Sequence, residues 1–112
     1  MGKTVDILPG TLDMLILKAV SRKPLHGYGV LQRIAQISGE VLEIPQGSLY
    51  PALYRLEHQE LIVAEWGQSD NNRKAKFYSI TGSGRKQLAE ETASWARISA
   101  VMARLLKPAG QE

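Results

Sequence analysis

Basic side chains, which are the type that binds phosphate, gather in one stretch of the sequence. Residues 71–89 contain no Asp or Glu but five cations, namely Arg73, Lys74, Lys76, Arg85 and Lys86. The whole chain of 112 residues has a formal net charge of only +3, from 14 Lys and Arg against 11 Asp and Glu. Because the excess of positive charge is concentrated in residues 71–89, it indicates an anionic partner such as nucleic acid more strongly than the net charge does. A solvated surface with no partner is the alternative.

A second set of side chains, in the segment 46–55, is suited to contacting the edges of DNA bases. The set consists of hydrogen-bonding or aromatic residues beside an apolar stripe: Gln46, Ser48, Tyr50, Tyr54 and Arg55. Arg pairs bidentately with guanine and Gln with adenine, so Arg55 and Gln46 are candidates for direct base contacts. Two alternatives stay open at this point. Tyr50 can pack in the core with its hydroxyl on a phosphate, and Arg55 can pair with Gln59 or Glu60 on its own helix.

Residues for catalysis or metal binding are scarce. The chain has no cysteine, which removes disulfides, Cys-ligated zinc and thiol nucleophiles. His26 and His58 do not form a metal-ligand spacing such as His-x-x-x-His. His26 precedes a predicted helix start and is expected to be structural, and His58 is expected to be solvated. We therefore expect no enzyme activity, no metal site and no cofactor.

Length and composition predict one ordinary globular domain. A chain of 112 residues, with 44% hydrophobic and 22% charged residues, fits a single domain of about 100–150 residues. No stretch approaches the roughly 20 apolar residues of a membrane span. The first ten residues lack the apolar block of a signal peptide. These features predict a cytoplasmic protein without a membrane partner.

Apolar residues three and four positions apart predict three helices in the first half of the chain. The first runs over residues 11–21, and the second opens at His26 and ends at Ser38-Gly39. The third contains Pro51. We expect this helix to begin with Ser48 as its N-cap, because Pro51 is then the third helical residue and its missing N–H has no partner to lose.

The pattern changes after Glu60 to β-branched and aromatic residues. Segments 61–66 and 76–80 are predicted strands, and the polar loop 67–73 between them predicts a hairpin with a basic tip. Trp66, on the first strand, is expected in the core. The hairpin would place Arg73, Lys74 and Lys76 near phosphates, or an Arg in a narrow minor groove.

The last segment predicts a long helix with an apolar seam. Thr81 is its expected N-cap, and the seam residues alternate between spacings of four and three, which is typical of helix–helix packing. The seam consists of Leu88, Thr92, Trp95, Ser99, Met102 and Leu106, and a second row of Ile98, Val101 and Leu105 widens it. A monomer would expose this strip, so we expect homodimerisation through it.

The order of these elements predicts a mainly α fold, a winged helix-turn-helix with a long C-terminal helix. Three helices and a two-stranded β-hairpin wing would form a DNA-binding domain over residues 1–80. Residues 81–107 would form the dimerisation helix, and residues 108–112 a disordered tail. In such a fold the third helix enters the major groove of DNA. A winged-helix adaptor that binds protein and has no DNA affinity is the alternative.

Several short motifs resemble the PadR family of bacterial transcriptional regulators. They are His26-Gly27-Tyr28-Gly29, Gly47-Ser48-Leu49-Tyr50-Pro51-Ala52-Leu53, Arg55-Leu56-Glu57, Leu61-Ile62, Trp66, Arg73-Lys74-Ala75-Lys76-Phe77-Tyr78, Thr81 and Gly84. The ending resembles the short-tailed type of PadR protein, which has one C-terminal helix. The resemblance implies a homodimeric repressor that binds palindromic operator DNA, and in many members a small molecule or a stress signal releases the DNA.

The resemblance also implies roles for particular residues. The family's recognition positions correspond here to Ser48, Tyr50, Pro51, Tyr54 and Arg55. Its second-helix contact corresponds to Tyr28, and its wing positions correspond to Arg73, Lys74 and Lys76. Many members have Thr at the position of Ser48, which keeps the hydroxyl. Many have Gly at the position of Glu60, so this chain is expected to leave its third helix differently.

Trp95 lies in the middle of the predicted seam, where a two-fold axis would bring two copies together. Some short-tailed PadR proteins stack flat apolar drugs on such a tryptophan pair, which implies an effector site at Trp95 and Ser99 for a small apolar or aromatic molecule. A large aromatic residue at a dimer seam is also ordinary packing, and the sequence leaves both interpretations open.

Overall fold

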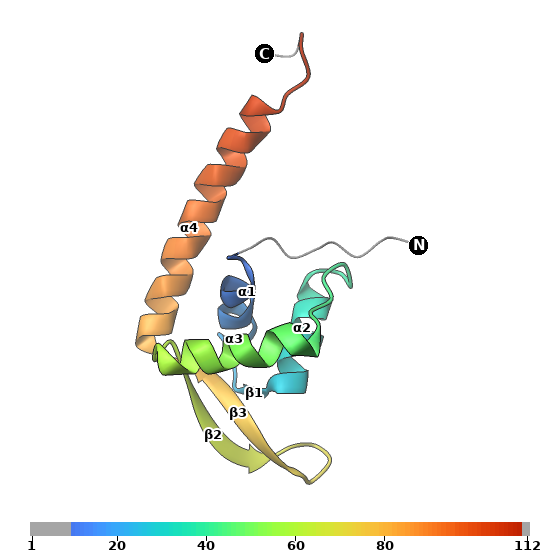
Figure 1. Ribbon diagram of the computed structural model, residues 1–112, viewed down its shortest axis with the longest axis vertical. Coiled ribbons are helices and arrows are strands. Elements are labelled where there is room, and N and C mark those ends of the chain that lie inside the picture. The colour runs from blue at the N-terminus through green and yellow to red at the C-terminus, as the bar shows by residue number, and fades with distance from the viewer. Residues whose placement is uncertain (1–9, 111–112) are drawn as a thin grey trace.

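The structure, a computed structural model, describes residues 10–110 (Figure 1). Its elements, in chain order, are α1 (Leu12–Ala19), β1 (Leu25–His26), α2 (Gly27–Ile37), α3 (Gln46–His58), β2 (Ile62–Gln68), β3 (Lys74–Ile80) and α4 (Gly82–Leu105). Helices α1, α2 and α3 pack together, the β2–β3 hairpin extends from one side of them, and α4 projects away from the hairpin. The mainly α winged helix-turn-helix fold with a long C-terminal helix is therefore confirmed.

The apolar stripes of the first three helices meet in one core. The largest fully buried side chains are Ile16 and Leu17 of α1, Val30 and Ile34 of α2, Leu49, Leu53 and Leu56 of α3, and also Val20 and Ile62. Each stripe recurs every three or four residues, so every helix turns one face inward. This core holds the N-terminal halves of α2 and α3 at fixed positions relative to the hairpin.

His26 has a structural role at the start of α2. Its Nδ1 accepts a hydrogen bond of 3.0 Å from the backbone N–H of Gly29, which caps the helix. Its ring also meets the ring of Phe77 edge-on, with 5.4 Å between centroids. Both contacts are local and structural, and they confirm the sequence-based interpretation of His26.

Helix α3 begins three residues earlier than the sequence predicted. Pro45 occupies the N-cap, and its carbonyl accepts hydrogen bonds from the N–H groups of Ser48 (3.0 Å) and Leu49 (3.1 Å). The prediction that Ser48 is the N-cap was therefore wrong, and Pro51 lies inside the helix. Pro51 has no N–H to donate to the carbonyl of Gly47. Open space surrounds Gly47, so this turn of the helix is accessible to solvent.

The hairpin prediction is confirmed, and one more strand joins it. Strands β2 and β3 pair antiparallel, and β1 pairs with the other edge of β3, giving the order β1-β3-β2. The strands are longer than predicted, so the connecting loop narrows to residues 69–73. Strand β1 has only two residues, which is too short for any alternation in the sequence to reveal it.

Glu60 ends α3 in the conformation that glycine favours. Its φ is +61°, and the N–H groups of Leu61 and Glu60 bond back to the carbonyls of Leu56 (3.0 Å) and Glu57 (2.9 Å). These two bonds form a Schellman motif with Glu60 at the usual glycine position. The exit of α3 therefore keeps the geometry of a glycine C-cap, contrary to the expectation from the side chain.

Replacing Glu60 with Gly is expected to stabilise the fold. A left-handed L-residue costs about 1–2 kcal/mol, and the extra entropy of an unfolded glycine removes about 0.5–1 kcal/mol of that gain. The expected increase in the free energy of unfolding is therefore about 0.5–1 kcal/mol, measured by denaturation at fixed protein concentration. Gln59→Gly is the matched control, because Gln59 has φ −82° and should lose stability instead. Equal effects of the two changes would contradict this account.

The start of α4 is attached closely to the end of α3. Thr81 caps α4 by accepting from the N–H of Gly84 at 2.9 Å, as predicted, and its hydroxyl donates to the Glu60 carbonyl at 2.8 Å. Gly84 is buried against the backbone of Leu61, where no side chain fits. Leu88 packs against the core. From Thr92 onward the side chains of α4 are exposed.

Candidate nucleic-acid interface

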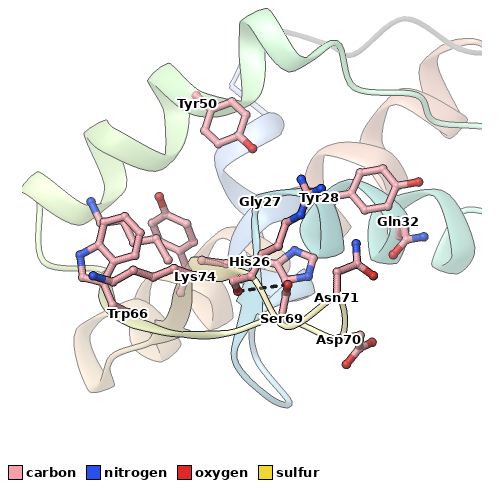
Figure 2. A pocket seen from close by; sticks show the side chains of 14 residues that line it. His26, Gly27, Tyr28, Gln32, Tyr50, Trp66, Ser69, Asp70, Asn71 and Lys74 are labelled. Carbon is pink, nitrogen blue, oxygen red and sulfur yellow. Dashed lines mark hydrogen bonds between the residues drawn. The ribbon is translucent and has the colours of Figure 1, made fainter.

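A groove separates the hairpin from the beginnings of α2 and α3 (Figure 2). Its volume is about 670 Å³. Four aromatic residues (Tyr28, Tyr50, Trp66 and Tyr78) and three basic ones (Arg73, Lys74 and Lys76) are among its lining residues. Figure 2 shows Tyr50 reaching in from α3, while Tyr28 comes from α2 and Trp66 and Lys74 come from the hairpin. Residues far apart in the sequence thus form one cationic and aromatic surface.

Tyr50 is half exposed and lies over the start of α2. Its side chain is 49% exposed, and its hydroxyl lies where a side chain on Gly27 would otherwise be, since a Cβ there would come within 2.5 Å of the oxygen. The absence of a side chain at Gly27 therefore sets the position of Tyr50. The sequence left open whether Tyr50 is exposed for contact with a base or packs in the core. The structure shows that its ring lines the groove and is not buried in the core.

The remaining polar face of α3 points away from the core. Gln46, Ser48, Pro51 and Tyr54 are exposed, and the buried stripe lies on the opposite side of the helix. Tyr54 is 72% exposed and stacks on His58, with 6.1 Å between the two ring centroids. The predicted division of α3 into an apolar stripe and a free polar face is confirmed. This free face is continuous with the groove through Tyr50.

Arg55 has a partner that the sequence did not indicate. Its guanidinium forms an ion pair with Asp13 of α1, with 2.5 Å between Nη2 and Oδ1. Neither Gln59 nor Glu60, the two predicted alternatives on its own helix, takes this place. The pair joins the C-terminal half of α3 to α1. Since the Arg55 side chain remains 50% exposed, part of the guanidinium is still open to solvent.

The three wing cations differ in their surroundings. Lys76 Nζ lies 3.5 Å from Glu57 of α3, which connects β3 to that helix. Lys74 Nζ lies 5.6 Å from the centroid of the Trp66 ring. In the part of the chain that the structure describes, Arg73 and Lys74 have no carboxylate partner. Of the three cations predicted to contact phosphates, Arg73 and Lys74 therefore have no ion-pair partner among the described residues, and Lys76 is paired with Glu57 of α3.

Tyr78 contributes a neutral hydroxyl to the groove. The residue is only 7% exposed and belongs to the core. Burial raises the pKa of the Tyr78 phenol above its usual value, although the nearby Lys76 acts in the opposite direction. The phenol therefore stays protonated at neutral pH and remains available as a hydrogen-bond donor.

Trp66 corrects the sequence-based expectation most clearly. It was expected in the core, but its side chain is 65% exposed. Ile62, Ala64 and Trp66 alternate onto the same face of β2, and Ile62 and Ala64 pack on the core. The hairpin extends past the helices, so the third residue of this row lies over the groove. Alternation predicts the face of a residue but not where the core beneath that face ends.

The predicted seam on α4 divides into two parts. Leu88 packs into its own domain, and Thr92 donates its hydroxyl to the Leu88 carbonyl at 2.7 Å. Beyond them an apolar strip is exposed, formed by Trp95, Ile98, Val101, Met102, Leu105 and Leu106. Trp95 and Ile98, together with Met14 of α1 and Glu91, line a cavity of about 240 Å³. Ser99, the other predicted effector residue, is not among its lining residues.

None of the helices within residues 10–110 is both long enough and apolar enough to cross a membrane. Within the same range, no three His, Asp or Glu side chains come together as a possible metal site.

Comparison with known proteins identifies the family. Residues 16–90 match the Transcriptional regulator PadR-like family. A Lysinibacillus sphaericus protein, Uncharacterized protein X, is 33% identical over 97 residues, which cover 87% of this chain and 89% of that protein. A PadR family transcriptional regulator from Eggerthella lenta is 33% identical with a TM-score of 0.75, covering 88% of this chain and 83% of that one.

A transcriptional regulator from Clostridium thermocellum has a TM-score of 0.81 at 25% identity, and the alignment covers 92% of this chain and all of that one. The family match, the fold and the placement of the groove agree. This chain belongs to the PadR-like family, whose members are DNA-binding transcriptional regulators with a winged-helix fold and not enzymes.

Proposed function

We propose that this chain is a cytoplasmic repressor that binds palindromic operator DNA as a homodimer. The observation that carries the proposal is the continuous surface formed by the free face of α3, Tyr28 and the wing cations. In this arrangement α3 lies in the major groove, where Gln46, Ser48 and Tyr54 reach base edges. Pro51 packs against a base or sugar, and Arg55 is limited to the helix end by Asp13.

The groove beside α3 receives the phosphate backbone of one DNA strand. Tyr28 and Tyr50 line one wall and donate hydroxyl hydrogen bonds to phosphate oxygens. Arg73 and Lys74 on the opposite wall supply the positive charge, with Lys76 in support. Contacts of this type fix the position and orientation of a protein on the duplex and leave sequence reading to the recognition helix.

The homodimer forms through the apolar strip of α4. Its six large side chains are between 44% and 72% exposed in the single chain, and helix α4 is 24 residues long, about 36 Å. The exposed apolar strip occupies residues 95–106 of this segment, and an exposed strip of this kind is typical of a subunit interface. A second copy of the same helix would cover it and place two α3 helices on one face of the dimer.

A small apolar or aromatic effector would bind beside Trp95. The cavity there holds about 240 Å³, slightly less than the roughly 300 Å³ at which ordinary ligand sites begin. A partner subunit would add the missing wall, and we place Ser99 on the partner side of that site. An effector that binds better to one separation of the two α3 helices would change DNA affinity by that difference.

Selection from a pool of random duplexes, followed by gel-shift titration, tests the proposed function. We expect one palindromic sequence to be recovered and bound with a Kd of about 10⁻⁸ M or tighter at physiological salt. Light scattering of the free protein should give twice the monomer mass of 12.4 kDa. A monomer, or a dimer that binds protein but no duplex, would contradict the proposal and favour an adaptor.

Gly27→Ala separates the DNA-binding role of Tyr50 from fold stability. The added methyl group would displace the Tyr50 hydroxyl, while Ala is a better helix former than Gly at this first position of α2. We expect the free energy of unfolding to stay equal or rise, and DNA affinity to fall about tenfold, the value of a hydrogen bond to a charged group. Gly82→Ala is the control, because open space surrounds Gly82. Equal DNA affinity of the two variants would show that Tyr50 is not a contact.

A further inference from the structure

Trp66 exposes a large aromatic surface at the mouth of the groove. The side chain lies on the inner face of β2, beyond the last residue of that row that packs on the core. It is 65% exposed, although an indole gains more from burial than most side chains do. Neither the fold nor the contacts proposed above for the DNA backbone explain why this position holds a tryptophan.

The neighbours of Trp66 are cationic. Lys76 lies directly opposite it in the antiparallel register. Lys74, two residues before Lys76 on the same face of β3, has its ammonium 5.6 Å from the indole centroid. This distance is within the range of a cation–π contact. Figure 2 shows Trp66 and Lys74 together at one end of the groove, with Tyr50 on the facing wall.

We propose that Trp66 is itself a DNA contact, with its indole packed against a deoxyribose of the strand that crosses the groove. This inference rests on the proposed function. A strand in duplex DNA presents phosphates and sugars outward, so a groove that receives it needs cations for the phosphates and an apolar surface for the sugars. Lys74 and Lys76 meet the first need, and the indole beside them meets the second.

The surrounding charge favours DNA as the partner over a protein surface. A tryptophan at a protein interface usually lies in the buried core of the contact, which is depleted of charged residues and of lysine in particular. Trp66 instead has a lysine opposite and another diagonal to it, and the same groove continues into the free face of α3. The contact is to the backbone, so it positions the hairpin and carries no sequence preference.

Affinity measured over a range of salt concentrations tests the contact, using the duplex recovered by selection. Trp66→Ala should lower affinity about tenfold, as loss of an aromatic contact with nucleic acid does. The slope of log K against log salt should stay unchanged because no charge is removed. Trp66→Phe should retain most of the affinity. Val63→Ala is the matched control, since Val63 is exposed on the outer face of the same strand, and it should bind like the wild type.

Two results would overturn the contact. Unchanged affinity of Trp66→Ala would show that the indole touches no DNA. A flatter salt slope in Trp66→Ala would show that Trp66 only holds Lys74 in place. If the wild-type protein binds no duplex, both this inference and the proposed function fail. If the wild-type protein binds the duplex and Trp66→Ala binds it equally well, this inference fails and the proposed function stands.

Fluorine NMR tests the contact without removing the Trp66 side chain. The chain has two tryptophans, so 5-fluorotryptophan in the full-length protein gives two resonances, which the Trp66→Phe variant assigns. Adding the selected duplex should shift the Trp66 resonance and protect it from the solvent-induced isotope shift. A Trp66 resonance that is unchanged in a fully bound complex would overturn the proposal.

Discussion

Replacing Arg73, Lys74 and Lys76 together with Gln is expected to abolish most DNA binding while leaving the fold intact. Each phosphate contact contributes about 0.9 to the slope of log K against log salt. Two wings supply up to six such contacts, of which the two made by Lys76 are shared with Glu57. The slope should therefore flatten by about 4 to 5, and affinity near 0.15 M salt should fall by about 10³–10⁴.

The control for the wing variant carries the same change of charge at another place. Arg97, Arg104 and Lys107 are exposed along the far part of α4, which projects away from the hairpin in Figure 1. Their replacement with Gln should change the slope only slightly, because these side chains lie far from the groove. Similar salt slopes for the two triple variants would show that the effect follows the net charge of the protein, and that the wing is not part of the DNA interface.

The second large effect concerns the dimer. Ile98→Glu combined with Leu105→Glu places two carboxylates in the apolar strip of α4. The two positions are seven residues apart, which is about two helical turns. Both side chains are more than half exposed in the single chain, so the domain itself should melt as before. We expect a monomer by light scattering and a loss of about 10³ in operator affinity, because two linked half-site contacts become independent.

Ala93→Glu combined with Ala100→Glu is the matched control for the dimer variant. The two positions have the same spacing of seven residues and are exposed, but they lie on the opposite side of α4 from the apolar strip. This variant should remain a dimer and bind operator DNA normally. Dissociation of the control, or a stable dimer in the Ile98 and Leu105 variant, would contradict dimerisation through the strip.

Features that depend on local periodicity could be predicted from the sequence. The buried stripe of α3, the hairpin and the Thr81 cap of α4 each follow from residue types a few positions apart. The structure confirms all three. His26 belongs to the same class, because a cap needs only the three residues that follow it.

Features that depend on tertiary contacts could not be predicted. The Arg55–Asp13 pair joins residues 42 positions apart, and no pattern within α3 indicates it. Trp66 lies on the predicted face, but its exposure depends on where the helices beneath the hairpin end. Helix α3 begins at Gln46 because the carbonyl of Pro45 is well placed to accept two hydrogen bonds, which outweighs the lost bond at Pro51.

Site-directed DNA cleavage tests most directly whether α3 enters the major groove. The chain has no natural cysteine, and a side chain at Gly47, on the exposed start of α3, meets open space. An iron chelate attached to Gly47→Cys should cleave the bound operator at two clusters of positions about one helical turn, 34–36 Å, or a multiple apart. Fully bound DNA without cleavage from this position would contradict the account, because α3 would then face away from the duplex.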